Sequence, residues 1–196
     1  MKIKMELLSD TIFGSGVSVP GGEDISILTD KDGFPYFKGE TLKGIIREEM
    51  GRYLEWTGKG DEVQKTIEKY FGKPGSTDNE DALDFSAFEL SGQVRNTVLK
   101  QIETDYPEAE KGRPDVVTDC LTNIRTFTAI EDGTVKKGSL RSARCINQGL
   151  FFYGTVSNLP NEESEIEMIK EVISMVKYVG TLRNRGFGRV RFSVAE

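Results

Sequence analysis

Two segments near the ends of the chain alternate strictly between apolar and polar residues. They are residues 3–7, Ile-Lys-Met-Glu-Leu, and residues 190–194, Val-Arg-Phe-Ser-Val. Side chains in a β-strand point to opposite faces in turn, so this period of two predicts a strand with one buried face. Each end of the chain is therefore expected to form a strand with one side in the core.

Apolar residues recur at helical spacing in two segments between these strands. The segments Leu42–Leu54 and Glu162–Tyr178 each place their apolar side chains on one face of a helix. Thr41 is expected to cap the first of these helices, and the acidic first turn of the second suits the helix dipole. A further helix is predicted over Asp61–Phe71.

Further strands are predicted over residues 25–28, 83–90 and 144–156. The resulting order is strand, helix, strand, long excursion, strand, helix, strand, which is typical of the split βαβ arrangement of ferredoxin-like and RRM-like sheets. We therefore predict an α+β fold in a single domain over residues 1–196. The excursion, at about residues 93–144, is expected to project as an inserted helical segment and a β-hairpin with its turn at Asp132-Gly133.

Composition excludes several kinds of chemistry. The 196 residues contain no His, which removes His general bases, Ser-His-Asp triads and the commonest zinc ligand. Catalysis would have to use carboxylates, Lys, Arg, Tyr, backbone groups or a hard metal ion. No apolar run is long enough to span a membrane, and the polar–apolar start is not a signal peptide. Cys120 and Cys145 match no metal spacing and are expected to be the reduced thiols of a cytoplasmic protein.

The charge is unevenly distributed along the chain. Its net value of −6 argues weakly against a free-standing nucleic-acid binder. Yet residues 125–147 and 180–196 each carry three more positive than negative charges. The simplest explanation of such segments is a solvated surface, and binding of an anion is the alternative.

The segment Gly180–Val190 (Gly-Thr-Leu-Arg-Asn-Arg-Gly-Phe-Gly-Arg-Val) interleaves arginines with glycines. Glycines let the backbone approach a ligand closely, and successive free N–H groups form a concave anion site. Arginine adds bidentate contacts to phosphate. The segment is not a nucleotide-binding P-loop, and a tight helix-to-strand turn is the structural alternative.

Two other segments carry candidate chemistry. Lys38–Arg47 joins a glycine turn to a helix N-terminus, where free N–H groups and the dipole favour anions; an ordinary capped surface helix is the alternative. Gly21–Asp30 places carboxylates in a loop, where a hard cation would support phosphoryl transfer; solubilising loop acids are the alternative.

Together these segments resemble the RAMP superfamily of CRISPR-associated proteins, in particular the repeating backbone subunit of type III (Csm and Cmr) effector complexes. Residues 24–30 (Asp-Ile-Ser-Ile-Leu-Thr-Asp) are similar to the family's D-x-P-V-x-R-D, with Ser26 in place of Pro and Thr29 in place of Arg. Residues 34–44 resemble L-P-x-I-P-G-S-S-L-K-G, with Lys38 in place of Pro and Glu40-Thr41 in place of Ser-Ser.

The remaining matches follow in chain order. Residues 70–72 (Tyr-Phe-Gly) and 83–88 resemble the family's L-F-G and F-x-D sections. Gly180–Val190 resembles G-G-x-x-S-R-G-x-G-R-V, with Asn184 at the Ser position, and is the most specific match.

The resemblance implies a modified RRM-like fold whose copies stack along a CRISPR RNA (crRNA), together with other effector subunits and no membrane. It implies that the hairpin at residues 126–144 is a thumb that displaces one nucleotide of the guide–target duplex at about six-nucleotide steps, in a duplex held by shape and backbone. Asp24 would cut the bound complementary target RNA with Mg²⁺ or Mn²⁺, while Asp30 takes a more structural position. The implied RNA-binding residues are Lys38, Lys43, Arg47, Arg125, Lys136, Arg141, Arg144, Arg183, Asn184, Arg185, Gly186, Gly188 and Arg189.

Three other functions remain open from the sequence. One is a non-catalytic scaffold or capping subunit of the same kind of complex, in which Asp24 does no chemistry. Another is a crRNA-processing endoribonuclease of the superfamily, against which the absence of His counts because many of those enzymes use a His base. The third is an α+β interaction domain in which the glycine–arginine segment is only a turn.

Overall fold

The alternating terminal strands lie side by side in the computed structural model, which describes residues 1–17, 22–73, 81–105 and 114–195. Strand β1 (Lys2–Leu7) pairs antiparallel with both β10 (Val190–Val194) and β9 (Phe151–Ser157). Met5 is opposite Phe192 on one side and Phe152 on the other, so three buried apolar side chains share one face of the sheet. The period of two in the sequence thus defines the core face of the sheet.

The complete sheet has the strand order β10-β1-β9-β4-β2, and all its pairs are antiparallel. Strands β2 (Tyr36–Phe37) and β4 (Phe88–Leu90) form one edge, and β3 (Asp84–Phe85) pairs with the end of β9. Helical crossings from β1 to β4 and from β9 to β10 each skip one strand of the sheet. This topology confirms the predicted ferredoxin-like fold.

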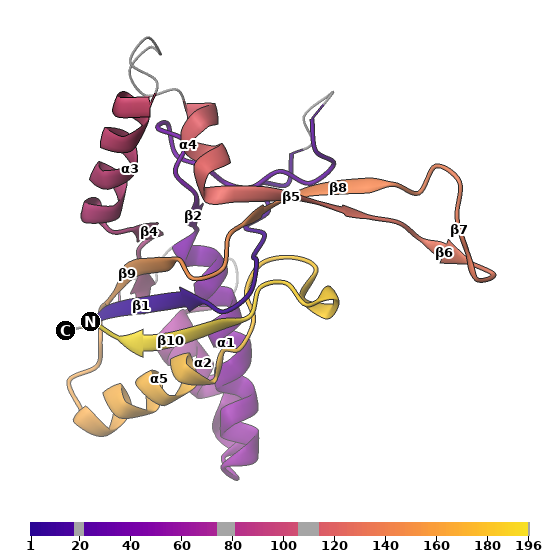
Figure 1. Cartoon of the computed structure of the whole chain (residues 1–196). Helices are drawn as coiled ribbons and strands as arrows, with labels where there is room; N and C mark the ends of the chain where they lie inside the picture. The colour runs from indigo at the N-terminus through magenta and orange to yellow at the C-terminus, as the bar shows by residue number, and fades with distance from the viewer. Residues whose placement is uncertain (18–21, 74–80, 106–113, 196) are drawn as a thin grey trace.

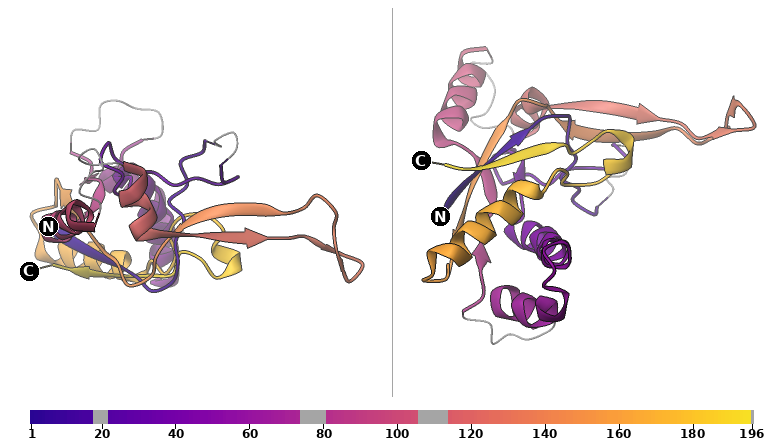
Figure 2. Two further views of the ribbon diagram at one scale, coloured as in Figure 1. Left: turned by 45° about the horizontal axis from the view of Figure 1, so that its top comes forward. Right: turned by 90° about the horizontal axis from the view of Figure 1, so that it is seen from below.

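Helices α1 (Gly39–Trp56) and α5 (Glu163–Met175) cover the core face of the sheet, and α2 (Val63–Phe71) packs against α1 (Figure 1, Figure 2). A short 3₁₀ turn, η1 (Gly60–Glu62), leads into α2. Helix α1 buries Leu42, Ile46 and Met50, one helical turn apart, and packs against α5. The core therefore lies between these helices and the apolar face of the strands.

The chain between β4 and β9 forms the inserted part of the molecule. It contains α3 (Gly92–Asp105), α4 (Pro114–Leu121) and a long hairpin of β5 (Thr122–Phe127) and β8 (Arg141–Ile146). Residues 106–113 of the predicted excursion lie outside the described residues. We call residues 122–146 the thumb, and β5 with β8 the thumb base. The thumb extends away from the sheet in every ribbon view (Figure 1, Figure 2).

The tip of the thumb is a second, smaller hairpin. Strands β6 (Ile130–Glu131) and β7 (Thr134–Val135) pair across Asp132 and Gly133, both of which have positive φ. Two consecutive positive φ angles are what a tight type I′ hairpin turn requires, so the Asp-Gly signal in the sequence marks this turn correctly.

Several predicted element boundaries are wrong. Helix α1 begins at Gly39 and Lys38 takes the N-cap position, so Thr41 lies inside the first turn and caps nothing. A Cβ on Gly39 would lie 1.9 Å from the carbonyl oxygen of Phe85, which shows that close packing on β3 rather than a side-chain cap fixes the helix start.

The predicted strand at residues 144–156 is two strands, β8 and β9. They are separated by a turn in which Gly149 has φ 84° and donates to the carbonyl of Leu7. The predicted strand at 83–90 is likewise divided into β3 and β4. Residues 25–28 form only isolated bridges, Ile25 with Ala143 and Ile27 with Gly14.

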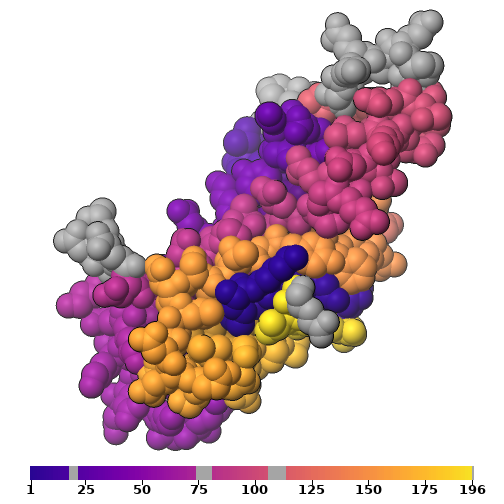
Figure 3. Space-filling view, turned by 90° about the vertical axis from the view of Figure 1, so that its left-hand side faces the viewer, coloured from indigo at the N-terminus to yellow at the C-terminus, as the bar shows by residue number. Residues whose placement is uncertain are grey.

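Both termini lie at the end of the sheet opposite the thumb. Figure 3 views the molecule from that end, with the first residues (indigo) beside the last described ones (yellow) and β9 with α5 (orange) around them. The N–H of Ala195 donates to the carbonyl of Lys2 at 2.9 Å, which joins the two ends. Across the described ranges, no helix is both long and apolar enough to cross a membrane.

Candidate nucleic-acid interface

The loop that carries Asp24 is attached to the thumb base through its backbone. Ile25 forms a parallel bridge with Ala143; its N–H donates to the carbonyl of Ser142, and its own carbonyl accepts from the N–H of Arg144. A single isolated bridge thus joins this loop to β8 on the side away from β5. Backbone pairing therefore fixes Asp24 beside the outer end of the thumb base, where Arg141 and Ser142 begin β8.

The carboxylate of Asp24 is held by two groups of β8. It accepts a hydrogen bond of 2.7 Å from the backbone N–H of Ser142 and one of 3.1 Å from the guanidinium of Arg141. The Ser142 N–H, followed by Arg141, lowers the pKa of Asp24 below its usual value. With 38% of its side chain exposed, Asp24 presents a charged carboxylate to solvent at neutral pH.

Three thumb-base arginines that the sequence assigned to RNA binding each pair with an acid. Arg141 pairs with Asp24, and Arg125 with Asp10. Arg144 contacts Glu23 and Asp119; its partial burial alone would lower its pKa, but these two carboxylates raise it above its usual value. The thumb base is thus linked electrostatically to the segments around it.

The glycine-rich segment lies against strand β5 of the thumb base. Leu182, Gly186 and Gly188 all have positive φ, and residues 183–185 form the 3₁₀ turn η2 (Arg183–Arg185). The ring of Phe187 stacks edge-on against Phe127 with centroids 5.6 Å apart, and the guanidinium of Arg185 lies 5.9 Å from the Phe127 centroid. Two segments that are far apart in sequence therefore share one aromatic contact.

A hollow of about 320 Å³ opens beside this contact. Its lining includes Phe127, Lys136, Lys137, Arg141 and Arg185. Lys136 pairs with Glu131, whereas Lys137 and Arg185 have no acidic partner among the residues the structure describes. An aromatic floor surrounded by cations suits a base and its phosphate.

The other predicted RNA-binding residues are divided between two places. The side chains of Arg183, Asn184 and Arg189 belong to the glycine-rich segment and form no ion pair or hydrogen bond with other described residues. The group Lys38, Lys43 and Arg47 lies on or next to the first turns of α1. That helix begins against β3, which pairs with the end of β9 farthest from the thumb. The structure therefore joins the glycine-rich segment to the thumb, and within the described ranges no hydrogen bond or ion pair joins the α1 group to either.

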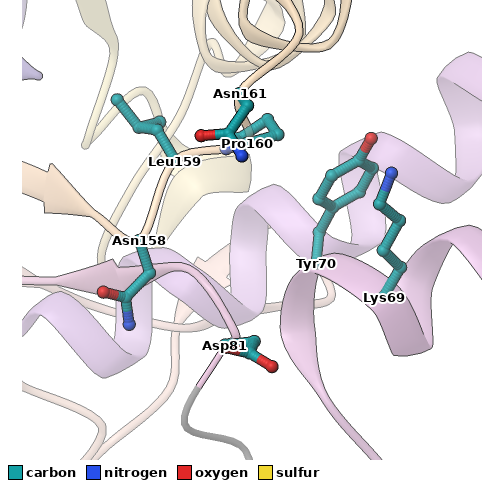
Figure 4. A pocket seen from close by; sticks show the side chains of 7 residues that line it. All are labelled: Lys69, Tyr70, Asp81, Asn158, Leu159, Pro160 and Asn161. Atoms are coloured by element: carbon teal, nitrogen blue, oxygen red, sulfur yellow. The ribbon is translucent and has the colours of Figure 1, made fainter.

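A larger hollow of about 520 Å³ lies elsewhere, between α2 and the turn that follows β9. In Figure 4, Tyr70 and Lys69 extend from α2 on one side of it, and Asn158 and Asn161 come from the turn on the other. The Lys69 ammonium pairs with Glu165, and no feature that the sequence singled out for chemistry lines this hollow. It is thus separate from the thumb interface.

The described residues contain no group of three or more His, Cys, Asp or Glu side chains placed to hold a metal ion. Asp24 is an exposed carboxylate beside the thumb base, and its neighbour Glu23 is engaged by Arg144. Mg²⁺ in nucleic-acid enzymes is commonly held by one or two carboxylates together with substrate phosphates. The donor set at Asp24 fits a metal of that kind, shared with RNA, and does not form an all-protein site.

The ferredoxin-like sheet, the projecting thumb and the glycine-rich segment together define a class of protein. Comparison with known protein families identifies that class. The family model of the RAMP superfamily matches residues 4–191, and the chain belongs to that superfamily. No curated protein sequence matches it.

Solved structures share the fold over nearly the whole chain. A chain of type III-B Cmr-beta bound to cognate target RNA superposes with a TM-score of 0.65 and 15% identity, covering 97% of this chain and 95% of that one. A chain of apo Cmr-beta gives 0.66 and 13%, covering 98% and 95%. Oligomeric Cmr4 from Pyrococcus furiosus gives 0.51 and 16%, covering 98% and 96%.

Sequence analysis missed Asp10, Phe127 and Phe187 as members of the interface. Phe187 was inside the glycine-rich segment but was not distinguished from its neighbours. Asp10 is the first acid after the N-terminal strand, and polar residues at strand ends often carry function. No signal in the sequence connects Asp10 or Phe187 with the thumb.

Proposed function

We propose that the chain is an RNA-binding subunit of a type III CRISPR effector ribonucleoprotein. Its partners would be crRNA, complementary target RNA, further copies of itself and other effector subunits. The observation that carries the proposal is the meeting of thumb and glycine-rich segment around Phe127, where Lys137 and Arg185 have no acidic partner in the described ranges. The fold shared with a chain of target-RNA-bound Cmr-beta supports it.

The physical chemistry of the interface agrees with this function. A guide–target duplex is recognised by its backbone and shape, so cations and backbone N–H groups suffice without readout of base edges. A Cβ on Gly186 would meet no atom within 4 Å, so the backbone there is open to a phosphate, and the flanking arginines add charge. A subunit that assembles in repeated copies needs little long-range attraction of its own, which is compatible with a net charge of −6.

We further propose that Asp24 takes part in cutting the target RNA at six-nucleotide steps. The carboxylate is exposed, charged and fixed beside the outer end of the thumb base. Asp24 would help to hold Mg²⁺ or Mn²⁺, which would supply positive charge for phosphoryl transfer. The RNA 2′-OH is the candidate nucleophile; its attack on the adjacent phosphorus would release the 5′-oxygen of the next nucleotide and leave a 2′,3′-cyclic phosphate. Arg141, beside the same carboxylate, is positioned to exchange it for a phosphate when RNA binds.

A scaffold without catalysis is the second candidate, and a specific contact favours it. The Asp24 carboxylate accepts the Ser142 N–H, so it caps a free backbone donor at the edge of β8. That bond by itself gives Asp24 a structural reason to be present. The two roles must therefore be separated by the choice of substitution.

Asp24→Asn separates them better than Asp24→Ala. The amide oxygen of Asn still accepts the Ser142 N–H, while the negative charge that a metal requires is lost. We would reconstitute the complex with crRNA and partner subunits, and add labelled complementary RNA with Mg²⁺. Catalysis by Asp24 predicts that wild type cuts at regular steps and that the variant binds RNA without cutting it.

The control is Asp30→Asn, which alters an aspartate of the same loop region that pairs with Arg95 on α3. It should bind and cut RNA as wild type does. Unchanged cutting by Asp24→Asn would reject the catalytic role and leave the scaffold. Absence of RNA from the purified wild-type complex would reject RNA binding itself.

A further inference from the structure

Asp10 occupies a junction between three parts of the molecule. It follows the end of β1, its side chain contacts the thumb base, and its backbone contacts the glycine-rich segment. Its carboxylate is only 14% exposed, in contrast to the more open Asp24. An acid placed there is suited to hold elements together rather than to meet a ligand.

Four donors surround the Asp10 carboxylate. Its Oδ2 accepts from Nε and Nη2 of Arg125, at 3.2 and 2.7 Å, and from the amide of Asn123 at 3.2 Å. Its Oδ1 accepts from the backbone N–H of Gln148 at 3.1 Å. Three of these donors share Oδ2 and one reaches Oδ1, so most of the roughly four acceptor sites of the carboxylate are used by groups of the protein itself.

The same residue also receives the glycine-rich segment. The carbonyl of Asp10 accepts from the N–H of Gly188 at 3.0 Å, and the neighbouring Ser9 hydroxyl accepts from the N–H of Arg189, also at 3.0 Å. One short stretch of chain therefore fixes both halves of the proposed interface. Moving the thumb base relative to the glycine-rich segment would break bonds at Asp10.

The electrostatics favour a permanent link. Partial burial raises the pKa of Asp10, but hydrogen bonds from Arg125, Gln148 and Asn123 outweigh it and hold the pKa below its ordinary value. Two nitrogens of Arg125 converge on one oxygen, a geometry that orients the guanidinium towards Asp10. The Arg141–Asp24 pair is more exposed at both side chains, 68% and 38% against 56% and 14% for Arg125–Asp10, so it exchanges partners more readily.

We propose that Asp10 is a positioning residue that, through Arg125, holds the thumb in place against the glycine-rich segment. Arg125 then has a structural role and does not bind RNA phosphate. This rests on the proposed RNA-binding function and replaces the role that the sequence assigned to Arg125. It also distinguishes Arg125, which has a structural role in the thumb base, from Arg141, which can exchange its carboxylate partner for a phosphate.

The salt dependence of RNA affinity distinguishes an arginine with a structural role from one that binds an RNA phosphate. Each phosphate contact that is lost lowers the slope of log K against log salt by about one. We would measure the affinity of the full chain for a fluorescein-labelled single-stranded RNA by anisotropy over a series of salt concentrations. Asp10→Asn and Arg125→Gln should each weaken binding by roughly tenfold, equivalent to about 1.4 kcal/mol, with an unchanged slope.

Two further variants complete the design. Arg185→Gln removes a cation of the hollow and should lower the slope by about one. The matched control Asp30→Asn removes an aspartate that likewise pairs with an arginine, here Arg95 of α3, and accepts backbone N–H groups of Asp32 and Phe34 rather than of the thumb; it should leave affinity and slope unchanged. The double variant of Asp10 and Arg125 should be no weaker than either single variant, because both remove the same link.

Hydrogen exchange on the RNA-free chain tests the link independently of RNA binding. In Asp10→Asn, amides of β5, β8 and residues 186–189 should exchange faster, while those of α1 and α5 stay as in wild type. Uniformly faster exchange would overturn the proposal, and so would a salt slope that falls in Arg125→Gln as it does in Arg185→Gln. If wild type bound no RNA, the proposed function would fail, and the exchange result would still decide the role of Asp10.

Discussion

Replacing Gly188 by alanine should destabilise the protein much more than replacing Gly186, two residues away in the same segment. Both glycines have left-handed backbone angles, φ 77° and 84°, which cost an alanine about 1–2 kcal/mol. They differ in their surroundings. A Cβ on Gly188 would lie 2.0 Å from the carbonyl oxygen of Val179, whereas one on Gly186 would meet no atom within 4 Å.

The additional cost at Gly188 follows from the hydrogen bonds around it. Relieving the contact requires a shift of about 1 Å, since a Cβ does not approach another atom within 3.0 Å. That shift would disrupt the bond from Val179 N–H to the Gly188 carbonyl, 2.8 Å, and the bond from Gly188 N–H to Asp10, 3.0 Å. At about 1 kcal/mol for each bond, Gly188→Ala should lose about 3–4 kcal/mol and Gly186→Ala about 1–2 kcal/mol.

Urea unfolding followed by circular dichroism would measure both variants. The expected result is a lower unfolding midpoint for Gly188→Ala, at an unchanged dependence of the free energy on urea. A typical domain can lose this much and stay folded, so both variants are expected to be measurable. Equal losses of stability in the two variants would refute the close approach of Gly188 to Val179 and the argument built on it.

Three further predictions concern the core, the thiols and acid. Phe152→Ala should destabilise the fold by about 3–5 kcal/mol because the ring of Phe152 is fully buried. Phe151 is its exposed neighbour, and Phe151→Ala should cost under about 1 kcal/mol. Urea unfolding would measure the stability of both variants. Exposed Cys120 should react at once with a thiol reagent, and Cys145 only after unfolding, because burial raises its pKa to about 11; two fast thiols in the native protein would contradict this. Since the pKa of Asp10 is lowered from 3.8, its contribution to stability is complete above that value and is lost as the pH falls through the lowered pKa. Wild type and Asp10→Asn should therefore converge in stability in acid, and a constant difference at all pH values would contradict the ion pair.

The parts of the fold that sequence predicted correctly depend on local patterns. The alternation at residues 3–7 and 190–194 forms paired strands, and the helical spacing at 162–178 forms α5, which ends a few residues early at Met175. The Asp132-Gly133 turn is placed correctly because its backbone angles favour those two residue types. In each case the signal and the structure occupy the same few residues.

The errors arise where distant contacts set the local structure. The start of α1 is fixed by the approach of Gly39 to Phe85, which no capping rule considers. The break between β8 and β9 exists because Gly149 donates to Leu7 of β1, so the chain turns from the thumb into the sheet. Propensities and periodicities do not register a partner that is distant in the sequence.

The candidate interface shows the same division. The sequence alone located the glycine–arginine segment, the acidic loop with Asp24 and the hairpin that becomes the thumb, because glycine spacing and charge are properties of the chain itself. Only the tertiary structure decided which arginines are engaged and which are open. It pairs Arg125 with Asp10, 115 residues apart, and brings Phe127 against Phe187. Hydrogen bonds and ring contacts depend on distance in space and fall off within a few ångströms, so their partners are determined by the fold and not by the order of residues.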